Sequence, residues 1–222
     1  MDFRFYGDID DVDDSSIVFD RSSRTVYLFK PRLNPEDEIA LRFSRILEKL
    51  RIEYVVVAGY IAILFGRGRR TEDLDFIVMP LTEDMFVDLC REVSEEGFTL
   101  MQGDVRLESS VRSVYRDYLA KGYSVRFMYG DVIFPNVEFK FSSTTIHKHA
   151  LNNSYRVVIN DEHTVKISPP ELQIVYKLYL GSDKDVGDAV FLYTLLKDDI
   201  DVNELERWCR ELKVNCSVLE GV

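Results

Sequence analysis

The chain lacks the long apolar run that a membrane-spanning helix needs. None of its hydrophobic stretches approaches the ~20 consecutive residues that cross a bilayer. The first 14 residues are acidic, whereas a secretory signal begins basic and continues apolar. Cysteine is scarce: the chain has three, Cys90, Cys209 and Cys216, which is an odd number. The spacing of the last two fits neither a zinc knuckle nor a C-x-x-C redox motif. We therefore expect a cytoplasmic protein with reduced, mostly buried thiols.

Positive charge is also in short supply. The 28 lysines and arginines face 39 aspartates and glutamates, which gives a formal net charge of −11. Proteins that wrap nucleic acid nonspecifically neutralise its phosphates with many cations, so this composition argues against such a surface. A polynucleotide partner would have to be met locally. Part of the acidic excess lies in residues 8–14, a run that is typical of a solvated segment.

No internal repeat, low-complexity tract or glycine–serine linker divides the 222 residues, so the organisation rests on the expected helices and strands. Apolar spacing, β-branched runs and capping residues predict these elements in turn. They are a hairpin in 17–30, a helix over 35–50, a strand at 54–58, a short helix at 60–65, a strand at 74–78, a helix over 82–97, a helix around 111–119, strands at 123–129 and 137–141 with a loop over 130–136, strands at 155–159 and 164–167, and three helices after residue 168, with Ser168–Glu171, Ser182 and Asn203 as caps.

This order indicates an α/β (α+β) fold, with a small mixed β-sheet covered by helices on one side and followed by a C-terminal helical bundle. We expect residues 1–35 to form an acidic segment and a hairpin. Residues 36–167 would form the sheet domain, and residues 168–222 the helical region.

Two carboxylates mark the second buried strand. Asp73 and Asp75 occupy positions i and i+2, and side chains two apart on a strand project to the same face. Like charges held close together at the end of an apolar strand are unfavourable unless a divalent cation joins them. The pair is therefore a candidate metal site, although a D-x-D pair alone is common and can also be a strand cap with a solvated neighbour.

A candidate phosphate site precedes these carboxylates. A strand that ends at Gly59 and Tyr60 and continues as a short helix presents free backbone N–H groups, which suit a phosphate. Arg67, Arg69 and Arg70 then offer charge-assisted hydrogen bonds to a triphosphate. A solvated charged turn is the plainer interpretation of such a cluster.

Taken together, residues 55–78, VVVAGYIAILFGRGRRTEDLDFIV, resemble the signature of the nucleotidyltransferase superfamily with the DNA polymerase β-type palm. That signature reads strand, Gly-Gly or Gly-Ser, short helix, Gly, then Arg-x-Thr-x-Asp-h-Asp-h, where h is apolar. Gly59, Gly66 and the segment from Arg69 through Thr71 to Asp75 supply its elements here. The chain looks closest to the stand-alone enzymes of the abortive-infection toxin type (AbiEii-like).

The resemblance extends to the C-terminal region. Relatives of that type carry a lysine and then a Lys-Asp-x-x-Asp motif, similar to Lys177 and the segment 184–188 (KDVGD) here. The resemblance implies that Lys177 reaches the triphosphate and that Asp185 orients it or a neighbouring base. Surface helices with charges four residues apart give the same pattern.

Two positions depart from the family pattern. Tyr60 replaces the second glycine or serine of the loop, where its ring could crowd the phosphates or stack on a base. The third carboxylate is not obvious, and we assign it to Glu138 because this residue follows the expected hairpin; Asp131 is the reserve candidate. A cross-strand ion pair with Arg126 or Lys140 is the alternative role for Glu138.

The resemblance implies transfer of a nucleoside monophosphate from a nucleoside triphosphate to a hydroxyl acceptor, an RNA end or a protein. Asp73, Asp75 and Glu138 would hold Mg²⁺ or Mn²⁺, and Glu138 would also help to deprotonate the acceptor. Gly59, Tyr60, Arg69, Arg70, Thr71, Lys177 and Asp185 would bind the nucleotide. An antitoxin or a second copy of the chain is the expected partner, and no membrane is involved.

Other functions remain open at this stage. The fold without activity, as a binding or partner protein, is one. A sugar-nucleotide transferase also uses a D-x-D pair but leaves Gly59 and Arg69 unexplained, and a D-x-D-x-T phosphatase needs threonine where Ile77 stands. His147 and His149 would share a face on a strand, but without a nearby third ligand they are more typical of polar surface.

Overall fold

The strands join into one mixed sheet in the computed structural model, which describes residues 4–5 and 16–219. Within these residues the sheet has ten strands in the order β1-β2-β3-β9-β10-β4-β5-β8-β7-β6. Their bounds are β1 Arg4–Phe5, β2 Ser16–Asp20, β3 Thr25–Leu28, β4 Tyr54–Val57, β5 Asp73–Val78, β6 Phe98–Leu100, β7 Val125–Tyr129, β8 Val132–Phe141, β9 Tyr155–Ile159 and β10 His163–Ile167.

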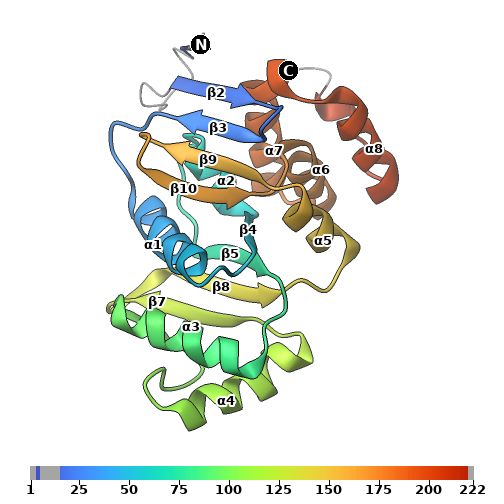
Figure 1. Ribbon diagram of the computed structural model, residues 1–222. Helices are drawn as coiled ribbons and strands as arrows, with labels where there is room; N and C mark the ends of the chain where they lie inside the picture. Colours follow the sequence, from blue (N-terminus) through green and yellow to red (C-terminus); the bar gives the residue numbers. More distant parts are fainter. Residues whose placement is uncertain (1–3, 6–15, 220–222) are drawn as a thin grey trace.

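The helices fall into two groups around this sheet (Figure 1). In the view of Figure 1, α1 lies in front of the strands and α3 and α4 below them, whereas α6, α7 and α8 gather to the right. The bounds are α1 Pro35–Lys49, α2 Gly59–Leu64, α3 Glu83–Glu95, α4 Glu108–Asp117, α5 Thr145–Asn152, α6 Pro170–Leu180, α7 Asp183–Leu196 and α8 Val202–Leu212, with 3-10 turns η1 Leu119–Lys121, η2 Lys197–Asp199 and η3 Ser217–Leu219.

An aromatic core lies between α1 and the central strands. The ring of Phe43 on α1 contacts Phe76 of β5, Phe127 of β7 and Phe139 of β8, with centroids 5.1–6.3 Å apart. Phe76 and Phe139 are register partners and therefore project to the same face. Because side chains alternate along a strand, the residues between them point to the opposite face.

That opposite face is also covered by helices, and one of them, α5, lies within residues 36–167, so the expectation that the helices of this segment cover one side of the sheet was wrong. Ile77 of β5 lines a hollow together with Ile146 of α5 and Leu172 and Tyr176 of α6. The C-terminal helices therefore pack against the face that the carboxylates of β5 share. The apolar pattern of the strands is compatible with either arrangement, because strands covered on both faces read as nearly continuous hydrophobic runs.

The N-terminal hairpin is confirmed as β2 and β3, and it forms part of the sheet. Strand β3 pairs in parallel with β9, from Thr25 opposite Arg156 to Leu28 opposite Ile159. The acidic run of residues 8–14 lies outside the described residues.

The first long helix begins as the sequence predicts. Asn34 accepts a hydrogen bond from the Asp37 amide at 2.8 Å, and Asp37 accepts one from the Asn34 amide at 3.0 Å. This capping box, with Pro35 in the first turn, fixes the start of α1.

Of the caps predicted for the C-terminal helices, Ser182 is confirmed at the start of α7, but those for α6 and α8 were wrong. Ser168 cannot close a capping box with Glu171, because its amide donates to the Val56 carbonyl at 2.9 Å. Glu171 instead accepts from Arg21 at 3.2 Å and from the Asp201 amide at 2.8 Å. Helix α8 is capped by Asp201 rather than by Asn203.

The segment that carries His147 and His149 is helix α5, so the expected strand was wrong. Thr144 caps it through a hydrogen bond from the His147 amide at 3.1 Å. The imidazole of His149 packs edge-on against Trp208, with ring centroids 4.8 Å apart.

Cys209 and Cys216 form a disulfide bond, which corrects the expectation of three reduced thiols. Cys90 is free and buried, and burial raises the pKa of its thiol. Within the described ranges, no helix combines the length and the apolar character that a membrane crossing requires.

Candidate active site

Four register partners bring the candidate carboxylates into one row across the sheet. Val57 of β4 stands opposite Asp75 of β5, Asp75 opposite Glu138 of β8, and Glu138 opposite Arg126 of β7. Register partners project to the same face, and Asp73 shares that face because it lies two residues from Asp75. The structure therefore brings Asp73, Asp75 and Glu138 together.

Arg126 lies among these acids. Its Nη2 donates a hydrogen bond to Glu138 Oε2, and its Nε lies 3.6 Å from Asp73 Oδ1. The sequence suggested Arg126 only as an alternative partner of Glu138. Its second contact, with Asp73, follows from the order of β5, β8 and β7 in the sheet.

Asp75 carries the clearest electrostatic sign of a functional site. Burial, followed by the nearby negative charges of Glu138 and Asp73, raises the pKa of this carboxyl from 3.8 to about 7. Lys177 and Arg126 oppose the shift but do not cancel it. A cation placed there would favour the ionised form of Asp75 against both its burial and the neighbouring negative charges.

The protein supplies only part of a metal coordination shell. Across residues 4–5 and 16–219, no three histidine, cysteine or acidic side chains converge closely enough to hold a metal ion among themselves. Mg²⁺ is usually bound by one or two carboxylates, with water and substrate phosphates as the other ligands. The oxygen donors of Asp73 and Asp75 fit that requirement.

The loop between β4 and α2 adopts an unusual backbone conformation. Ala58 has φ 62° and ψ −134°, a combination that residues with a Cβ rarely adopt. Gln173 of α6 holds this residue twice: its Oε1 accepts from the Ala58 amide at 3.2 Å, and its Nε2 donates to the Ala58 carbonyl at 2.9 Å. Gln173 is thus a positioning residue that the sequence patterns did not reveal.

Gly59 leaves room for an arginine. A Cβ atom on Gly59 would lie 3.0 Å from Arg69 Nη2 and 3.1 Å from Thr71 Oγ1. Arg69 Nη2 donates to the Gly59 carbonyl at 3.0 Å, and Thr71 Oγ1 donates to the Asp73 carbonyl at 3.1 Å. The motif residues between the two strands therefore fix one another's positions.

Asp188 of α7 gathers three cations on one carboxylate that is completely buried. It accepts from Arg69 at 2.8 and 2.6 Å, and it lies 3.2 Å from Arg67 and 3.0 Å from Lys177. The last position of the KDVGD segment was the only sequence signal for this role. The guanidinium of Arg69 donates hydrogen bonds to Asp188 and to the carbonyl groups of Gly59 and Arg70. It therefore holds the loop in place through contacts within the protein.

One cleft collects most of the remaining candidates. This Gly59 cleft, with a volume of about 710 Å³, is open to solvent beside Asp73 and Asp75. Helices α6 and α7 wall it with Lys177 and Asp185, whose Nζ and Oδ1 lie 2.6 Å apart. Its lining is Ala58, Gly59, Arg70, Thr71, Glu72, Asp73, Asp75, Phe134, Pro135, Lys177, Leu180, Lys184 and Asp185.

A second hollow adjoins the cleft at Asp75. This α5 hollow has a volume of about 240 Å³. Ala58, Asp75 and Leu180 line both spaces, so Asp75 stands between them. The other lining residues of the hollow are Val57, Phe76, Ile77, Glu138, Lys140, Ile146, His147, Ala150, Ser168, Leu172, Gln173 and Tyr176.

Three expected residues take different places. Tyr60 is completely buried and donates its hydroxyl to Asp37 Oδ1 at 3.0 Å, so its ring packs beneath the loop and cannot stack on a base in the cleft. Arg70 stays largely exposed and donates to the buried Glu36 at 2.6 Å. Asp131 is exposed in the turn between β7 and β8.

No family model matches the chain, and no curated protein matches it. Among solved structures it is similar to an antigenic nucleotidyltransferase-like protein from Paracoccidioides brasiliensis, with 15% identity over 83% of this chain and 96% of that one and a TM-score of 0.49. It is also similar to the antibiotic-resistance factor ANT(2'')-Ia, with 9% identity over 81% and 92% of the two chains and a TM-score of 0.42. Because both TM-scores lie below 0.5, we base the functional proposal on the residues of this chain.

Proposed function

We propose that this protein is a magnesium-dependent nucleotidyltransferase, which transfers a nucleoside monophosphate from a nucleoside triphosphate to a hydroxyl acceptor. The observation that carries the proposal is the Gly59 cleft. In it, Asp73 and Asp75 share one strand face with Glu138 nearby, and Lys177 and Lys184 stand on the opposite wall.

The carboxylates of β5 are the proposed metal ligands. Asp73 and Asp75 would hold Mg²⁺, or Mn²⁺ in its place, while phosphate oxygens and water complete the shell. When bound, the ion would withdraw charge from the phosphates at the reacting centre. The raised pKa of Asp75 supports this assignment, because burial and then the negative charges of Glu138 and Asp73 disfavour its ionised form, which a bound cation would stabilise.

The cations around the cleft would bind the triphosphate. Lys184 is exposed and lines the cleft, so its charged group can reach a phosphate. Arg70 also lines the cleft, but it would have to give up its ion pair with Glu36 to bind one. Lys177 is buried against Asp185 and Asp188, so it contributes a fixed positive charge close to Asp75. Arg69 would act indirectly, by holding Gly59 and thereby the backbone N–H groups of the loop.

Glu138 is the proposed proton acceptor. Arg126 holds one of its oxygens, which fixes the orientation of the carboxylate beside Asp75. A carboxylate in that place can accept the proton of an attacking hydroxyl. Positioning and charge stabilisation then account for the rest of the chemistry of phosphoryl transfer.

A second candidate function is a protein that binds a magnesium nucleotide without transferring it. The contact of Arg126 with both Asp73 and Glu138 favours it, because a guanidinium there occupies space that a second metal ion would need. The antitoxin or second copy of this chain that the motif resemblance implies stays a prediction under either function.

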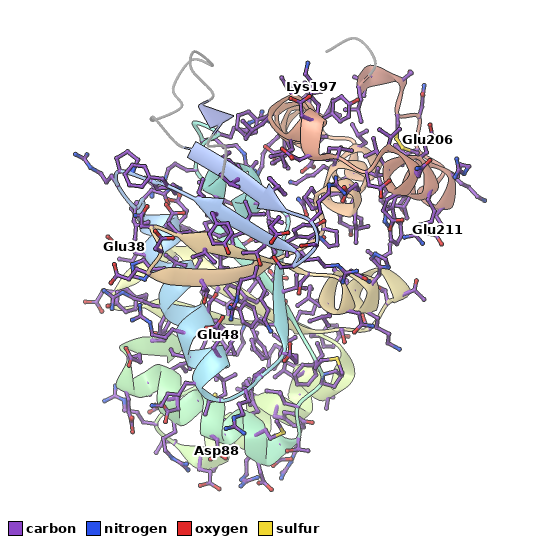
Figure 2. The ribbon with its side chains drawn as sticks, turned by 45° about the horizontal axis from the view of Figure 1, so that its top comes forward. Glu38, Glu48, Asp88, Lys197, Glu206 and Glu211 are labelled. Atoms are coloured by element: carbon purple, nitrogen blue, oxygen red, sulfur yellow. A yellow bond between two sulfur atoms is a disulfide. The ribbon has the colours of Figure 1, made fainter. Side chains whose placement is uncertain are left out.

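The two functions separate in one experiment. The purified chain is titrated with each nucleoside triphosphate and Mg²⁺ by calorimetry, and a parallel sample with α-³²P-labelled triphosphates is assayed for labelled acceptor and for released pyrophosphate. An enzyme would bind the triphosphate and release pyrophosphate with labelling of the acceptor, whereas a binding protein would bind the triphosphate without either product. Asp73→Asn should abolish both signals. Asp88→Asn should leave them unchanged, because Asp88 is an exposed residue of α3 (labelled in Figure 2) that is not among the lining residues of the cleft.

A further inference from the structure

The two hollows on either side of Asp75 differ in chemistry. The Gly59 cleft carries Arg70, Lys177 and Lys184 and opens to solvent. The α5 hollow is smaller, and Lys140 is its one lysine or arginine among the lining residues that the structure describes. The two substrates of a transfer reaction would therefore meet different surroundings.

In-line displacement sets where each substrate must lie. The attacking oxygen and the leaving oxygen stand on opposite sides of the phosphorus during phosphoryl transfer. If the β- and γ-phosphates occupy the cationic Gly59 cleft, the attacking oxygen approaches from the other side of Asp75. That side is the α5 hollow, and Glu138 is among its lining residues.

The walls of the α5 hollow are mostly apolar. Ile77 comes from the sheet, Ile146 and Ala150 from α5, and Leu172 and the ring of Tyr176 from α6. Such walls suit an apolar body and offer little to the phosphates of a polynucleotide, which need several cations.

His147 adds one neutral hydrogen-bond donor. Its Nδ1 accepts from the Ser143 amide at 3.3 Å, which leaves the hydrogen on Nε2. Burial, with the nearby charge of Lys140, lowers the pKa of this imidazole and keeps it uncharged at neutral pH. A neutral donor suits a neutral acceptor.

We infer that the acceptor is a neutral hydroxyl group on a compact, largely apolar side chain, that of tyrosine, threonine or serine, and that it enters through the α5 hollow. The inference rests on the proposed function and names its acceptor class. The volume of about 240 Å³ is smaller than that of pockets for drug-sized ligands and accommodates a single ring.

Transfer moves one proton and replaces one phosphorus–oxygen bond by another. The acceptor O–H gives its proton to Glu138, and the acceptor oxygen forms a bond to the α-phosphorus of the triphosphate. The bond from that phosphorus to the oxygen bridging to the β-phosphorus breaks, and pyrophosphate leaves through the Gly59 cleft. Arg126 holds Oε2 of Glu138, so Oε1 is the oxygen that would accept the proton.

The test offers alternative acceptors to the whole chain with Mg²⁺ and a mixture of the four α-³²P-labelled triphosphates. The acceptors are N-acetyl-tyrosinamide, N-acetyl-threoninamide, N-acetyl-serinamide, a short tyrosine-containing peptide, and an RNA oligonucleotide with a free 3′ hydroxyl. We expect label on at least one amino-acid amide and on the peptide but none on the RNA. Labelling of the peptide alone would place the acceptor within a polypeptide, and labelling of the free amides as well would extend the class to small molecules.

A variant that fills the hollow separates this inference from the proposed function. Ile146→Trp should reduce transfer to the amide by roughly tenfold or more while leaving calorimetric binding of the magnesium triphosphate unchanged. Leu107→Trp, at an exposed residue before α4, is the matched control and should change neither quantity.

Four outcomes decide between the possibilities. Labelled RNA with unlabelled amides, or bound nucleotide with no acceptor labelled, overturns the inference and leaves nucleotide binding standing. Undiminished transfer by a folded Ile146→Trp variant also overturns it. Failure of the wild-type chain to bind any magnesium triphosphate removes the proposed function, and the inference with it.

Discussion

Gln173 holds both polar backbone groups of Ala58, the residue with φ 62° that connects β4 to α2. Conformations of this kind cost on the order of 1–3 kcal/mol in residues that carry a Cβ, and they persist where the surroundings impose them. The side chain that imposes it comes from α6, and Ala58 lines the Gly59 cleft. The helical region therefore shapes the loop at which we place the phosphates.

Gln173→Ala should lower the free energy of unfolding by about 1–3 kcal/mol, because it leaves the half-buried amide and carbonyl of Ala58 without their side-chain partner. Triphosphate affinity should fall as well, since the loop is then free to relax. Urea unfolding and calorimetry measure the two effects. Gln173→Glu keeps the acceptor for the Ala58 amide but sets a buried carboxylate oxygen against the Ala58 carbonyl, so it should lower stability at least as much as Gln173→Ala. Equal affinity in all three proteins would contradict this role.

Asp188→Ala should destabilise the protein by about 3–5 kcal/mol, because it leaves Arg67, Arg69 and Lys177 without their shared buried carboxylate. Denaturant unfolding measures the loss. If Asp188→Ala does not fold, Asp188→Asn keeps the shape and some hydrogen bonds, and it should show a smaller loss. A change in the free energy of unfolding of no more than about 0.5 kcal/mol, which is typical of surface substitutions, would show that Asp188 does not hold the cluster together.

Asp75→Asn should abolish magnesium-dependent transfer yet stabilise the metal-free protein at pH 8. The folded-state pKa of about 7 lies above the unfolded value of 3.8, so the folded protein retains a proton that the unfolded chain has lost between these pH values. The contribution of this group to stability is complete below pH 3.8 and is lost as pH rises through about 7. The Asp75→Asn variant has no ionisable group at this position, so its stability does not fall in this way as pH rises.

The measurement is thermal unfolding of both proteins from pH 5 to pH 8 without metal. The melting temperature of the wild type should fall relative to the variant by a few degrees across this window, roughly as expected for 1–2 kcal/mol in a chain of this size. Asp88→Asn, at an exposed site, should follow the wild type. Parallel curves for all three proteins would mean that Asp75 is ionised throughout.

Tyr60→Phe should cost about 1–2 kcal/mol of stability through the lost hydrogen bond to Asp37, and it should leave triphosphate affinity unchanged. The ring stays in the core, so packing is preserved. Weakened nucleotide binding without a change in stability would instead support contact between Tyr60 and a base.

Local patterns were enough to place the carboxylates. The i and i+2 spacing of Asp73 and Asp75 predicts a shared strand face, and the structure has it, because strand geometry alone decides the matter. Asn34 caps α1 as its sequence context predicts, for the same reason. Both features depend on residues within one short segment.

Contacts between distant segments could not be predicted in this way. Asp188 binds Arg69 across 119 positions of the chain, and Gln173 binds Ala58 across 115. Nothing in the spacing of either pair indicates the other, since the partners meet only when α6 and α7 pack against the loop. The fully buried ring of Tyr60 belongs to the same class, because its direction depends on where α1 lies.

The pairing of β3 with β9 has a consequence for how the chain is made. Lys30 exchanges two hydrogen bonds with Asn160, 130 residues later, so the early hairpin emerges from the ribosome long before its neighbour exists. Until then, one edge of the hairpin presents unpaired backbone groups. Sheets closed by such distant pairings form slowly, since the loop between the partners must close first. A nascent chain of this protein cannot complete its sheet until translation has passed β9 and β10, which end about three quarters of the way along the sequence.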